Sequence, residues 1–229
     1  MANINGFQSY FQFKQIDWPT MWEATVETVW LTAVSVLLVA ILGFLLGLVL
    51  YQTNGKMDFM SRLLNGIVAL FVNVFRSVPF IILIVLLIPM TKELMGTMIG
   101  PKAAIPALIV SAAPFYARLV ELAFREVDSG VIEATRALGA SKWQIIWQVL
   151  LPESMPALVS GLTVTAISLL GYTAMAGVIG AGGLGNLAYT EGFQANQNTI
   201  TLVATIIILI IVFICQTAGD IIIAKIDHR

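Results

Sequence analysis

One segment combines charged and small residues that could contact another protein. The segment contains, in order, Glu133, Ala134, Thr135, Arg136, Gly139, Leu151 and Pro152. Glu133 and Arg136 can make polar contacts at the rim of a partner's groove, and Ala134 is small enough for a close approach. These residues include no nucleophile with a base and no set of metal ligands. The chemistry that the segment favours is therefore recognition of another protein.

The same segment, about 128–151, predicts two short amphipathic helices separated by a glycine. Asp128 or Ser129 can cap the first helix, and Gly139 can end it in the left-handed conformation. Ser141 with Gln144 forms a capping-box pattern for the second helix. One apolar face of that helix is formed by Trp143, Ile146, Trp147, Leu150 and Leu151. An ordinary amphipathic loop at a membrane surface is the alternative interpretation.

The composition indicates an integral membrane protein. Of the 229 residues, 59% are hydrophobic and only 11% are charged, whereas roughly a quarter of the residues of a soluble domain are charged. A helix that crosses a bilayer needs ~20 mostly apolar residues. Five such stretches are predicted, at about 27–51, 63–89, 103–124, 152–175 and 199–224. We therefore expect an all-α membrane protein with five transmembrane helices, in which Pro152 and Pro156 end the second loop helix and begin the fourth span.

The sequence predicts one transmembrane domain, 23–229, after an N-terminal segment, 1–22. That segment is extracytoplasmic or interfacial because it is rich in aromatic residues, and a partly ordered tail is the alternative. The Lys and Arg residues beside the spans predict the orientation. If the 128–151 loop is cytoplasmic, the cytoplasmic side has Lys56, Arg62, Arg118, Arg125, Arg136, Lys142, Lys225 and Arg229, and the outer side has Lys14, Lys92 and Lys102. The N-terminus is then outside and the C-terminus is cytoplasmic.

Arg76 is a charged residue within the second predicted span. A charge at mid-bilayer costs ~2.5 kcal/mol or more, so such a residue usually faces protein or water. A snorkelling anchor on the cytoplasmic side is the alternative. Pro79 weakens the helix nearby, which predicts a kink.

Two helical stripes could line a path through the membrane. The fourth span has Gly161, Thr165, Ser168, Tyr172 and Met175 on one face, and of these Tyr172 and Met175 are the candidates for a gate. Tight helix packing through small residues is the alternative for this stripe. In the third span, Glu121 can pair with Arg118 and Arg125. That cluster is expected either at the cytoplasmic mouth of the path or at a solvated helix end.

Glycines mark two further places. Gly43 and Gly47 form a G-x-x-x-G pair in the first span, which predicts close helix packing. The spacing of Gly180, Gly182 and Gly185 formally matches a dinucleotide-binding fingerprint, but that motif needs a βαβ unit around it. Here the glycines follow a membrane span, so we expect a flexible loop at the mouth of the path.

The sequence argues against an enzyme. His228 is the only histidine and Cys215 the only cysteine, and neither has a catalytic partner near it in the sequence. No metal site is expected. The chain has no phosphate-binding lysine motif of the Walker type, so any ATP would be hydrolysed by a partner. It also has no basic cluster of the kind that binds nucleic acid.

The pattern E-A-x-x-x-x-G, nine residues and then aliphatic-x-L-P resembles the cytoplasmic loop by which ABC-importer permeases dock onto their ATPase subunits. Further segments resemble the permease subunit of methionine-uptake importers, which are binding-protein-dependent transport system inner-membrane components. These segments are 75–83, 112–118, 171–177, 180–185 and 216–220. Thr135 and Val149 depart conservatively from the generic loop pattern.

This resemblance implies a multi-pass subunit of the bacterial cytoplasmic membrane, working as a homodimer with two cytoplasmic ATPase subunits and an extracytoplasmic substrate-binding protein. ATP and Mg²⁺ would be bound by the ATPase subunits, and this chain would bind no cofactor. The implied substrate is an amino acid, L- and/or D-methionine, imported by alternating access. A permease for another small substrate, or an ion-coupled secondary transporter, remains the alternative; the latter usually shows internal repeats.

Overall fold

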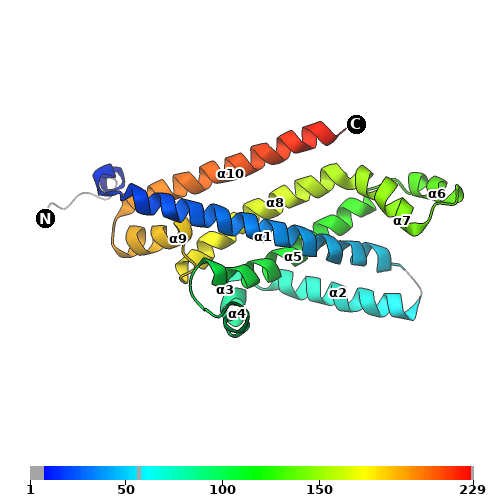
Figure 1. Cartoon of the computed structure of the whole chain (residues 1–229), viewed down its shortest axis with the longest axis horizontal. Helices are drawn as coiled ribbons and strands as arrows, with labels where there is room; N and C mark the ends of the chain where they lie inside the picture. The colour runs from blue at the N-terminus through cyan, green and yellow to red at the C-terminus, as the bar shows by residue number, and fades with distance from the viewer. Residues whose placement is uncertain (1–7, 56–57, 228–229) are drawn as a thin grey trace. The chain divides into compact units, whose positions relative to one another are not determined.

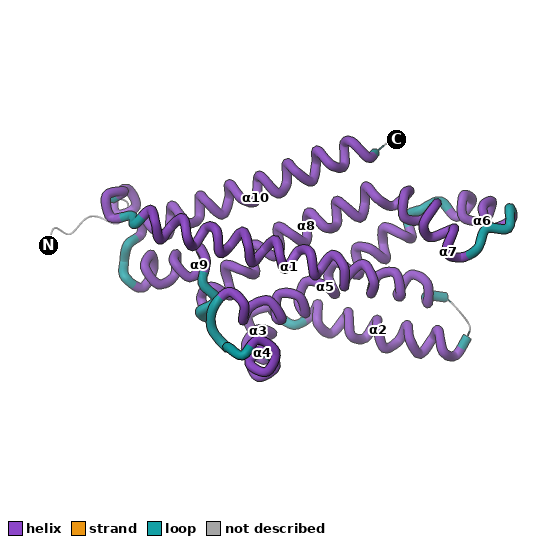
Figure 2. Tube along the Cα trace, in the orientation of Figure 1, coloured by secondary structure: helices purple, strands orange, loops and turns teal. Residues whose placement is uncertain are grey.

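The computed structural model describes residues 8–55 and 58–227, and these residues form helices joined by short turns (Figures 1 and 2). The helices are α1 (Trp18–Thr53), α2 (Phe59–Ser77), α3 (Phe80–Leu86), α4 (Ile88–Met95), α5 (Pro101–Arg125), α6 (Ser129–Ala137), α7 (Lys142–Ile145), α8 (Leu151–Val178), α9 (Gly183–Leu187) and α10 (Asn198–Ile226). Short 3₁₀ turns precede α1, and π-helical segments follow α7 (Ile146–Leu150) and α9 (Ala188–Gln194). No strand occurs within the described ranges.

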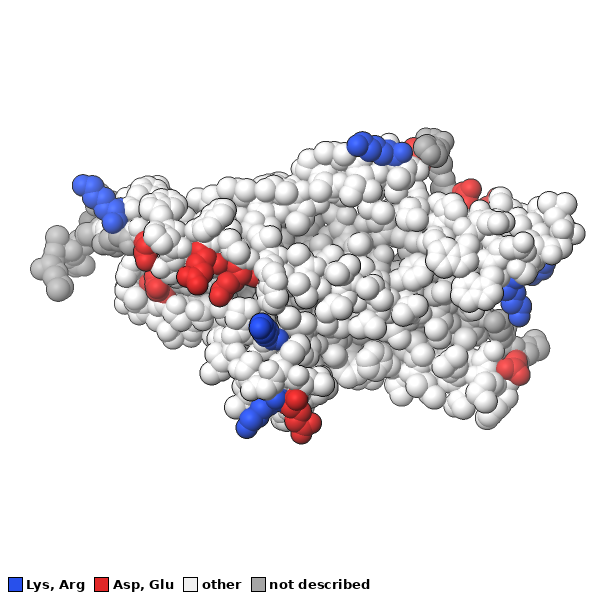
Figure 3. All heavy atoms as spheres, in the orientation of Figure 1, with Lys and Arg blue, Asp and Glu red and all other residues white. Residues whose placement is uncertain are grey.

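Five helices are long and apolar enough to cross a membrane, which confirms the predicted fold class. They are Trp18–Thr53, Phe59–Ser77, Pro101–Arg125, Lys142–Val178 and Asn198–Ile226. Many of their large apolar side chains are exposed, among them Leu37, Phe213 and Ile214, and few charged atoms interrupt the white surface of the face drawn in Figure 3. Such a surface suits contact with lipid, because an apolar side chain gains nothing from facing water.

Two of the predicted boundaries differ from the structure. The first helix begins at Trp18, within the segment 1–22 that the sequence places before the membrane domain. The second span does not run on to residue 89, because α2 ends at Ser77 and a new helix begins at Phe80. Pro79 is the N-cap residue of that new helix, with φ −57° and ψ 134°. The chain is thus broken here rather than kinked, and Arg76 is exposed in the last turn of α2, where a cation is favourable.

The described helices divide into two compact units, each built from three separated stretches of chain. One unit comprises Met1–Leu37, Val78–Ser111 and Ala166–Cys215, and the other comprises Leu38–Ser77, Ala112–Thr165 and Gln216–Arg229. Neither unit is a continuous piece of sequence, so each depends on contacts between helices that are distant in the chain.

In the first unit, the glycine-rich turn is an ordered cap instead of the predicted flexible loop. The Gly183 N–H donates to the Glu27 carboxylate at 2.8 Å, and the Leu184 N–H donates to the Thr28 hydroxyl at 2.8 Å. These bonds satisfy the first N–H groups of α9, which a helix start leaves without partners. A Cβ on Gly185 would lie 2.3 Å from the Ala174 carbonyl oxygen, so α9 packs backbone to backbone on α8. The flexible-loop prediction was wrong because residues far away in the sequence hold the turn.

In the second unit, α1 packs closely against the part of α5 that begins at Ala112. A Cβ on Gly47 would lie 2.5 Å from the Ala117 carbonyl oxygen, and one on Gly43 would lie 2.8 Å from the Tyr116 ring. The predicted close packing of these two glycines is therefore confirmed, and its partner is α5. The Tyr116 hydroxyl donates to the Leu158 carbonyl at 3.2 Å, which also ties α8 to α5.

Candidate coupling surface and transport path

The loop between α5 and α8 folds into two capped helices, as the sequence predicts. Asp128 is the residue that caps α6, accepting from the Gly130 N–H at 2.7 Å. Gly139 ends the helix at φ +86°, and its N–H donates to the Arg136 carbonyl at 3.0 Å. The next N–H, of Ala140, donates to the Thr135 carbonyl at 3.3 Å. This pair of bonds is a Schellman cap, so the turn is fixed at both of its ends.

The second helix of the loop starts with the predicted capping box. The Gln144 N–H donates to the Ser141 hydroxyl at 3.3 Å, and the Ser141 N–H donates to the Gln144 side-chain oxygen at 2.8 Å. Figure 1 shows α6 and α7 together, beyond the ends of α5 and α8. Two capped helices around a fixed glycine turn form a rigid projection, which we call the α6–α7 projection (residues 128–151).

The surface of the α6–α7 projection is available to a partner. Glu133, Ala134 and Arg136 are exposed, whereas Thr135 is half-buried and donates its hydroxyl to the Val131 carbonyl at 2.8 Å. The apolar residue Leu138 is 89% exposed. Trp143 and Trp147, which the sequence assigns to the apolar face of the second helix, are exposed as well. Apolar side chains left outside a rigid projection are typical of a surface that another protein covers.

Leu151 and Pro152 lie where the projection joins α8, and the helix does not end there. Lys142–Val178 runs on as one helix, so the expectation that Pro152 and Pro156 end the loop helix was wrong. The segment before them is π-helical, and the Leu151 N–H donates to the Ile146 carbonyl. This wider turn accommodates a proline, which has no N–H to donate. The Ser154 hydroxyl also donates to the Leu150 carbonyl at 2.6 Å.

Beside the projection, α5 carries a carboxylate shared between two guanidinium groups. Glu121 forms ion pairs with Arg118, at 2.5 Å, and with Arg125, which confirms the predicted pairing. The Glu121 side chain is only 2% exposed while both arginines are about 40% exposed. The interpretation of this cluster as a solvated helix end is therefore wrong for Glu121, because packing covers the carboxylate and the two cations neutralise it.

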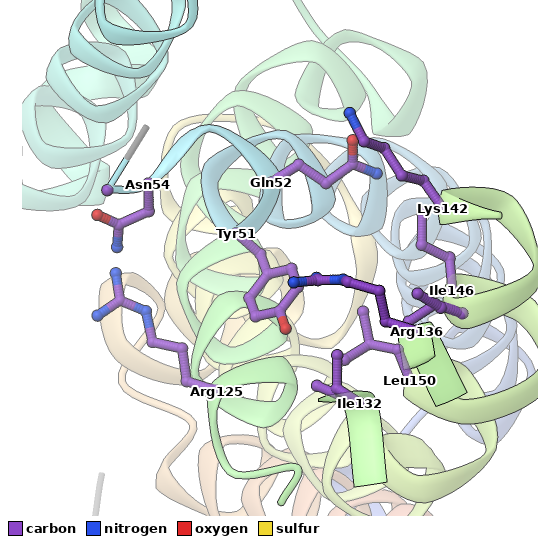
Figure 4. A pocket seen from close by; sticks show the side chains of 11 residues that line it. Tyr51, Gln52, Asn54, Arg125, Ile132, Arg136, Lys142, Ile146 and Leu150 are labelled. Atoms are coloured by element: carbon purple, nitrogen blue, oxygen red, sulfur yellow. The ribbon is translucent and has the colours of Figure 1, made fainter. Parts of the chain in front are cut away.

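A pocket of about 500 Å³ opens between the end of α1, the end of α5 and the α6–α7 projection. It is lined by Tyr51, Gln52, Asn54, Gly55, Arg125, Ile132, Arg136, Lys142, Ile145, Ile146 and Leu150. Figure 4 shows the Arg136 side chain reaching toward the Tyr51 ring, and Asn54 and Arg125 pointing toward one another. Of these residues the sequence indicates Arg136 for coupling, but it gives no signal for Tyr51, Gln52 or Asn54, which lie at the end of α1 and in the turn after it.

The predicted path residues on α8 are not equivalent in the structure. Thr165 is fully buried, and its hydroxyl donates to the Gly161 carbonyl at 2.7 Å. Ser168 and Tyr172 are half-buried, and Met175 is exposed. The four side chains therefore do not lie on one exposed face of the chain.

Tyr172 has an aromatic partner that its sequence neighbourhood does not predict. Its ring stacks on that of Phe80, with centroids 4.8 Å apart and planes inclined by 12°. Phe80 is buried at the first turn of α3, directly after the break at Pro79. The break thus places an aromatic ring that fixes the orientation of Tyr172, and no spacing in the sequence connects the two.

The described part of the chain contains no group of three or more His, Cys, Asp or Glu side chains that could bind a metal ion.

Comparison with known proteins gives consistent results. Residues 41–229 match the family model described as binding-protein-dependent transport system inner membrane component. The chain is 54% identical to the methionine import system permease protein MetP of Bacillus subtilis, covering 97% of this chain and 100% of that protein. It is 42% identical to the probable D-methionine transport system permease protein MetI of Pasteurella multocida, covering 92% and 99%.

Solved structures agree with these relatives. A chain of the MetNI methionine ABC transporter in inward-facing conformations superposes with a TM-score of 0.87 at 42% identity, covering 91% of this chain and 97% of that one. A chain of an amino acid ABC transporter crystallised with histidines superposes with a TM-score of 0.69 at 19% identity, covering 92% and 99%. The second similarity is a similarity of fold.

Proposed function

The chain belongs to the family of binding-protein-dependent transport system inner membrane components, and from this membership we propose that it forms the methionine-conducting channel of an ATP-driven importer. The observation that supports methionine as the substrate is the 54% identity to a methionine import permease over 97% of the chain. Both L- and D-methionine are candidate substrates, since a relative at 42% identity is named for the D-form.

We infer that the working unit contains two copies of this chain, two cytoplasmic ATPase subunits and an extracytoplasmic substrate-binding protein. The rigid, exposed α6–α7 projection supports docking of the ATPase subunit, with Ala134 at the closest approach and Glu133 and Arg136 at its rim. ATP and Mg²⁺ belong to the ATPase subunits. The whole of 23–229 then acts as one transmembrane domain, with the N-terminus outside and the C-terminus in the cytoplasm of a bacterial cell.

In the proposed cycle, ATP binding closes the ATPase pair and carries the docked projections with it. Each projection continues through the π-helical segment into α8 without a break, so a movement of the projection is passed to α8 as a lever. Leu151 and Pro152 lie at this junction. The channel turns from inward-open to outward-open, and ATP hydrolysis returns it.

We propose that the solute passes along the α8 face that includes Ser168 and Met175, with Tyr172 at its edge. Stacking on Phe80 restricts the Tyr172 ring, which suits a gate that must close in one position. Thr165 contributes to helix packing beside this face instead of contacting the solute, because it is buried with its hydroxyl already bonded. The low charge of the face favours transient passage, with selectivity held mainly by the binding protein.

The substrate is tested by uptake of labelled methionine into proteoliposomes that contain this chain with its cognate ATPase and binding protein. We expect uptake that requires ATP on the ATPase side and is competed by unlabelled methionine but not by histidine or arginine. ATP hydrolysis that is stimulated by the binding protein but is not accompanied by methionine uptake would contradict the proposal that methionine is the substrate. Uptake that does not depend on ATP would contradict the proposal of an ATP-driven importer and favour an ion-coupled carrier.

A further inference from the structure

The pocket between α1 and the α6–α7 projection has an excess of positive charge. Arg125, Arg136 and Lys142 line it, and no carboxylate is among the described residues that line it. Arg125 is paired with Glu121, but that carboxylate is shared with Arg118, so the three groups together keep one positive charge. Neither Arg136 nor Lys142 forms an ion pair with a described residue. These cations come from three helical elements that line one pocket, in which Arg125 points toward Asn54, Arg136 toward the Tyr51 ring and Lys142 toward Gln52 (Figure 4).

Neutral hydrogen-bond donors and an apolar wall complete the lining of the pocket. The side-chain amides of Gln52 and Asn54 and the Tyr51 hydroxyl lie along the α1 side. Asn54 and Arg125 point toward one another without a hydrogen bond between them, so an acceptor placed between them would receive bonds from both. The buried side chains Ile145, Ile146 and Leu150 form an apolar wall.

We propose that this pocket binds a phosphate-bearing anion that joins the cytoplasmic end of α1 to the α6–α7 projection. A phosphate offers several acceptor oxygens to guanidinium, ammonium and amide donors at once. The volume of about 500 Å³ lies within the ~300–1,000 Å³ of small-molecule sites. The apolar wall beside the cations suits a phospholipid headgroup with the start of its acyl chains; a free phosphate is the other source of the same chemistry.

The lipid source rests on the proposed membrane orientation, in which this pocket lies at the cytoplasmic surface of the bilayer. An anionic headgroup there would neutralise like charges that otherwise repel each other between the end of α5 and the projection. The bound anion would hold the projection against α1 and α5, and it would thereby stiffen the base of the lever that moves α8.

The test is native mass spectrometry of the purified full chain, which needs neither ATP nor methionine. The chain is offered phosphatidylglycerol and phosphatidylcholine with identical acyl chains, with and without millimolar inorganic phosphate. We expect selective retention of phosphatidylglycerol. The double variant Arg136→Gln with Lys142→Gln should retain about 25-fold less, on the basis of about fivefold per cation removed.

Two controls separate charge in the pocket from other effects. The matched variant Lys92→Gln with Lys102→Gln removes two exposed cations elsewhere and should bind as the native chain does. Arg136→Lys keeps the charge and should retain most of the binding, which also shows that a change at this position leaves the fold intact.

Displacement of the lipid by inorganic phosphate would identify free phosphate as an occupant, and persistence of the lipid would identify the headgroup; both support an anion site. Equal retention of the two lipids together with no phosphate-dependent mass shift would overturn the proposal. So would a pocket double variant that binds as well as the native chain. Failure of methionine uptake with intact anion binding would count against the proposed function alone.

Discussion

Replacement of Gly139 by valine is expected to abolish ATP-dependent methionine uptake while the chain still inserts into the membrane. Gly139 has φ +86°, and a Cβ added there would meet no atom within 4 Å, so the effect comes from the backbone and not from a clash. A non-glycine residue held in this region costs ~1–3 kcal/mol, which is about fivefold to 140-fold in the population of the native turn. The two Schellman bonds are lost with the turn, and the α6–α7 projection loses its fixed shape.

The matched control is Gly96→Val, since Gly96 also ends a helix at φ +72° with nothing within 4 Å. It lies after α4 and outside the projection, so the same backbone strain there should leave most of the uptake. The measurement is the initial uptake rate together with ATP hydrolysis in proteoliposomes. Equal losses from the two variants would show that Gly139 matters only for general folding. Unchanged uptake with Gly139→Val would remove the projection from the mechanism.

Replacement of Glu121 by glutamine is expected to lower the stability of the protein strongly. The buried carboxylate pairs with both Arg118 and Arg125, and removal of one member of a buried ion cluster costs up to ~3–5 kcal/mol. The variant leaves the Arg118 and Arg125 guanidinium groups, two turns apart on α5, without the carboxylate that they share. We expect the thermal unfolding midpoint in detergent to fall by on the order of 10 °C.

Glu126→Gln is the control for Glu121, because Glu126 is exposed near the same helix end and forms no ion pair with another described residue. Its midpoint should change little, as is usual at an exposed site. Adding Arg118→Gln to Glu121→Gln should restore part of the lost stability, because it removes one of the two unpaired cations. If Glu121→Gln unfolds at the native midpoint, the ion cluster contributes nothing to stability.

The sequence predicts most of the features that depend on residues close together in the chain. The five spans follow from apolar stretches long enough to cross a bilayer. The caps at Asp128, Gly139 and Ser141 follow from side-chain and glycine preferences within a few residues. The close packing of the first span at Gly43 and Gly47 also follows from the absence of side chains, although the sequence does not identify α5 as the partner.

Sequence patterns miss features that depend on contacts between stretches distant in the chain. They also misjudge places where a proline can either end a helix or be accommodated within it. Glu27 caps a helix that lies far along the chain, so the turn at Gly183 could not be recognised as ordered. A proline after Leu151 ordinarily predicts a helix end, but a π-helical turn removes the conflict. The same proline rule underestimated the effect at Pro79, where the helix ends entirely.

Burial decides which of the predicted path residues stay accessible. Spacing puts Thr165 on one face of α8 with Ser168, Tyr172 and Met175, but it does not say which part of that face is covered. Packing within the chain buries Thr165 and leaves Met175 open. Helical periodicity identifies the residues that share a face, and packing against neighbouring helices determines which of them remain accessible.

The most direct test of the account is whether Ala134 contacts the ATPase subunit. Because Cys215 is the only cysteine, a Cys215→Ala background allows a single Ala134→Cys to be labelled with a maleimide-benzophenone and irradiated in the assembled importer. Glu93→Cys, at an exposed position on α4, is the control. The account predicts a covalent product with the ATPase subunit from position 134 and none from position 93. No product from position 134 in an importer that still hydrolyses ATP, or equal products from both positions, would contradict it.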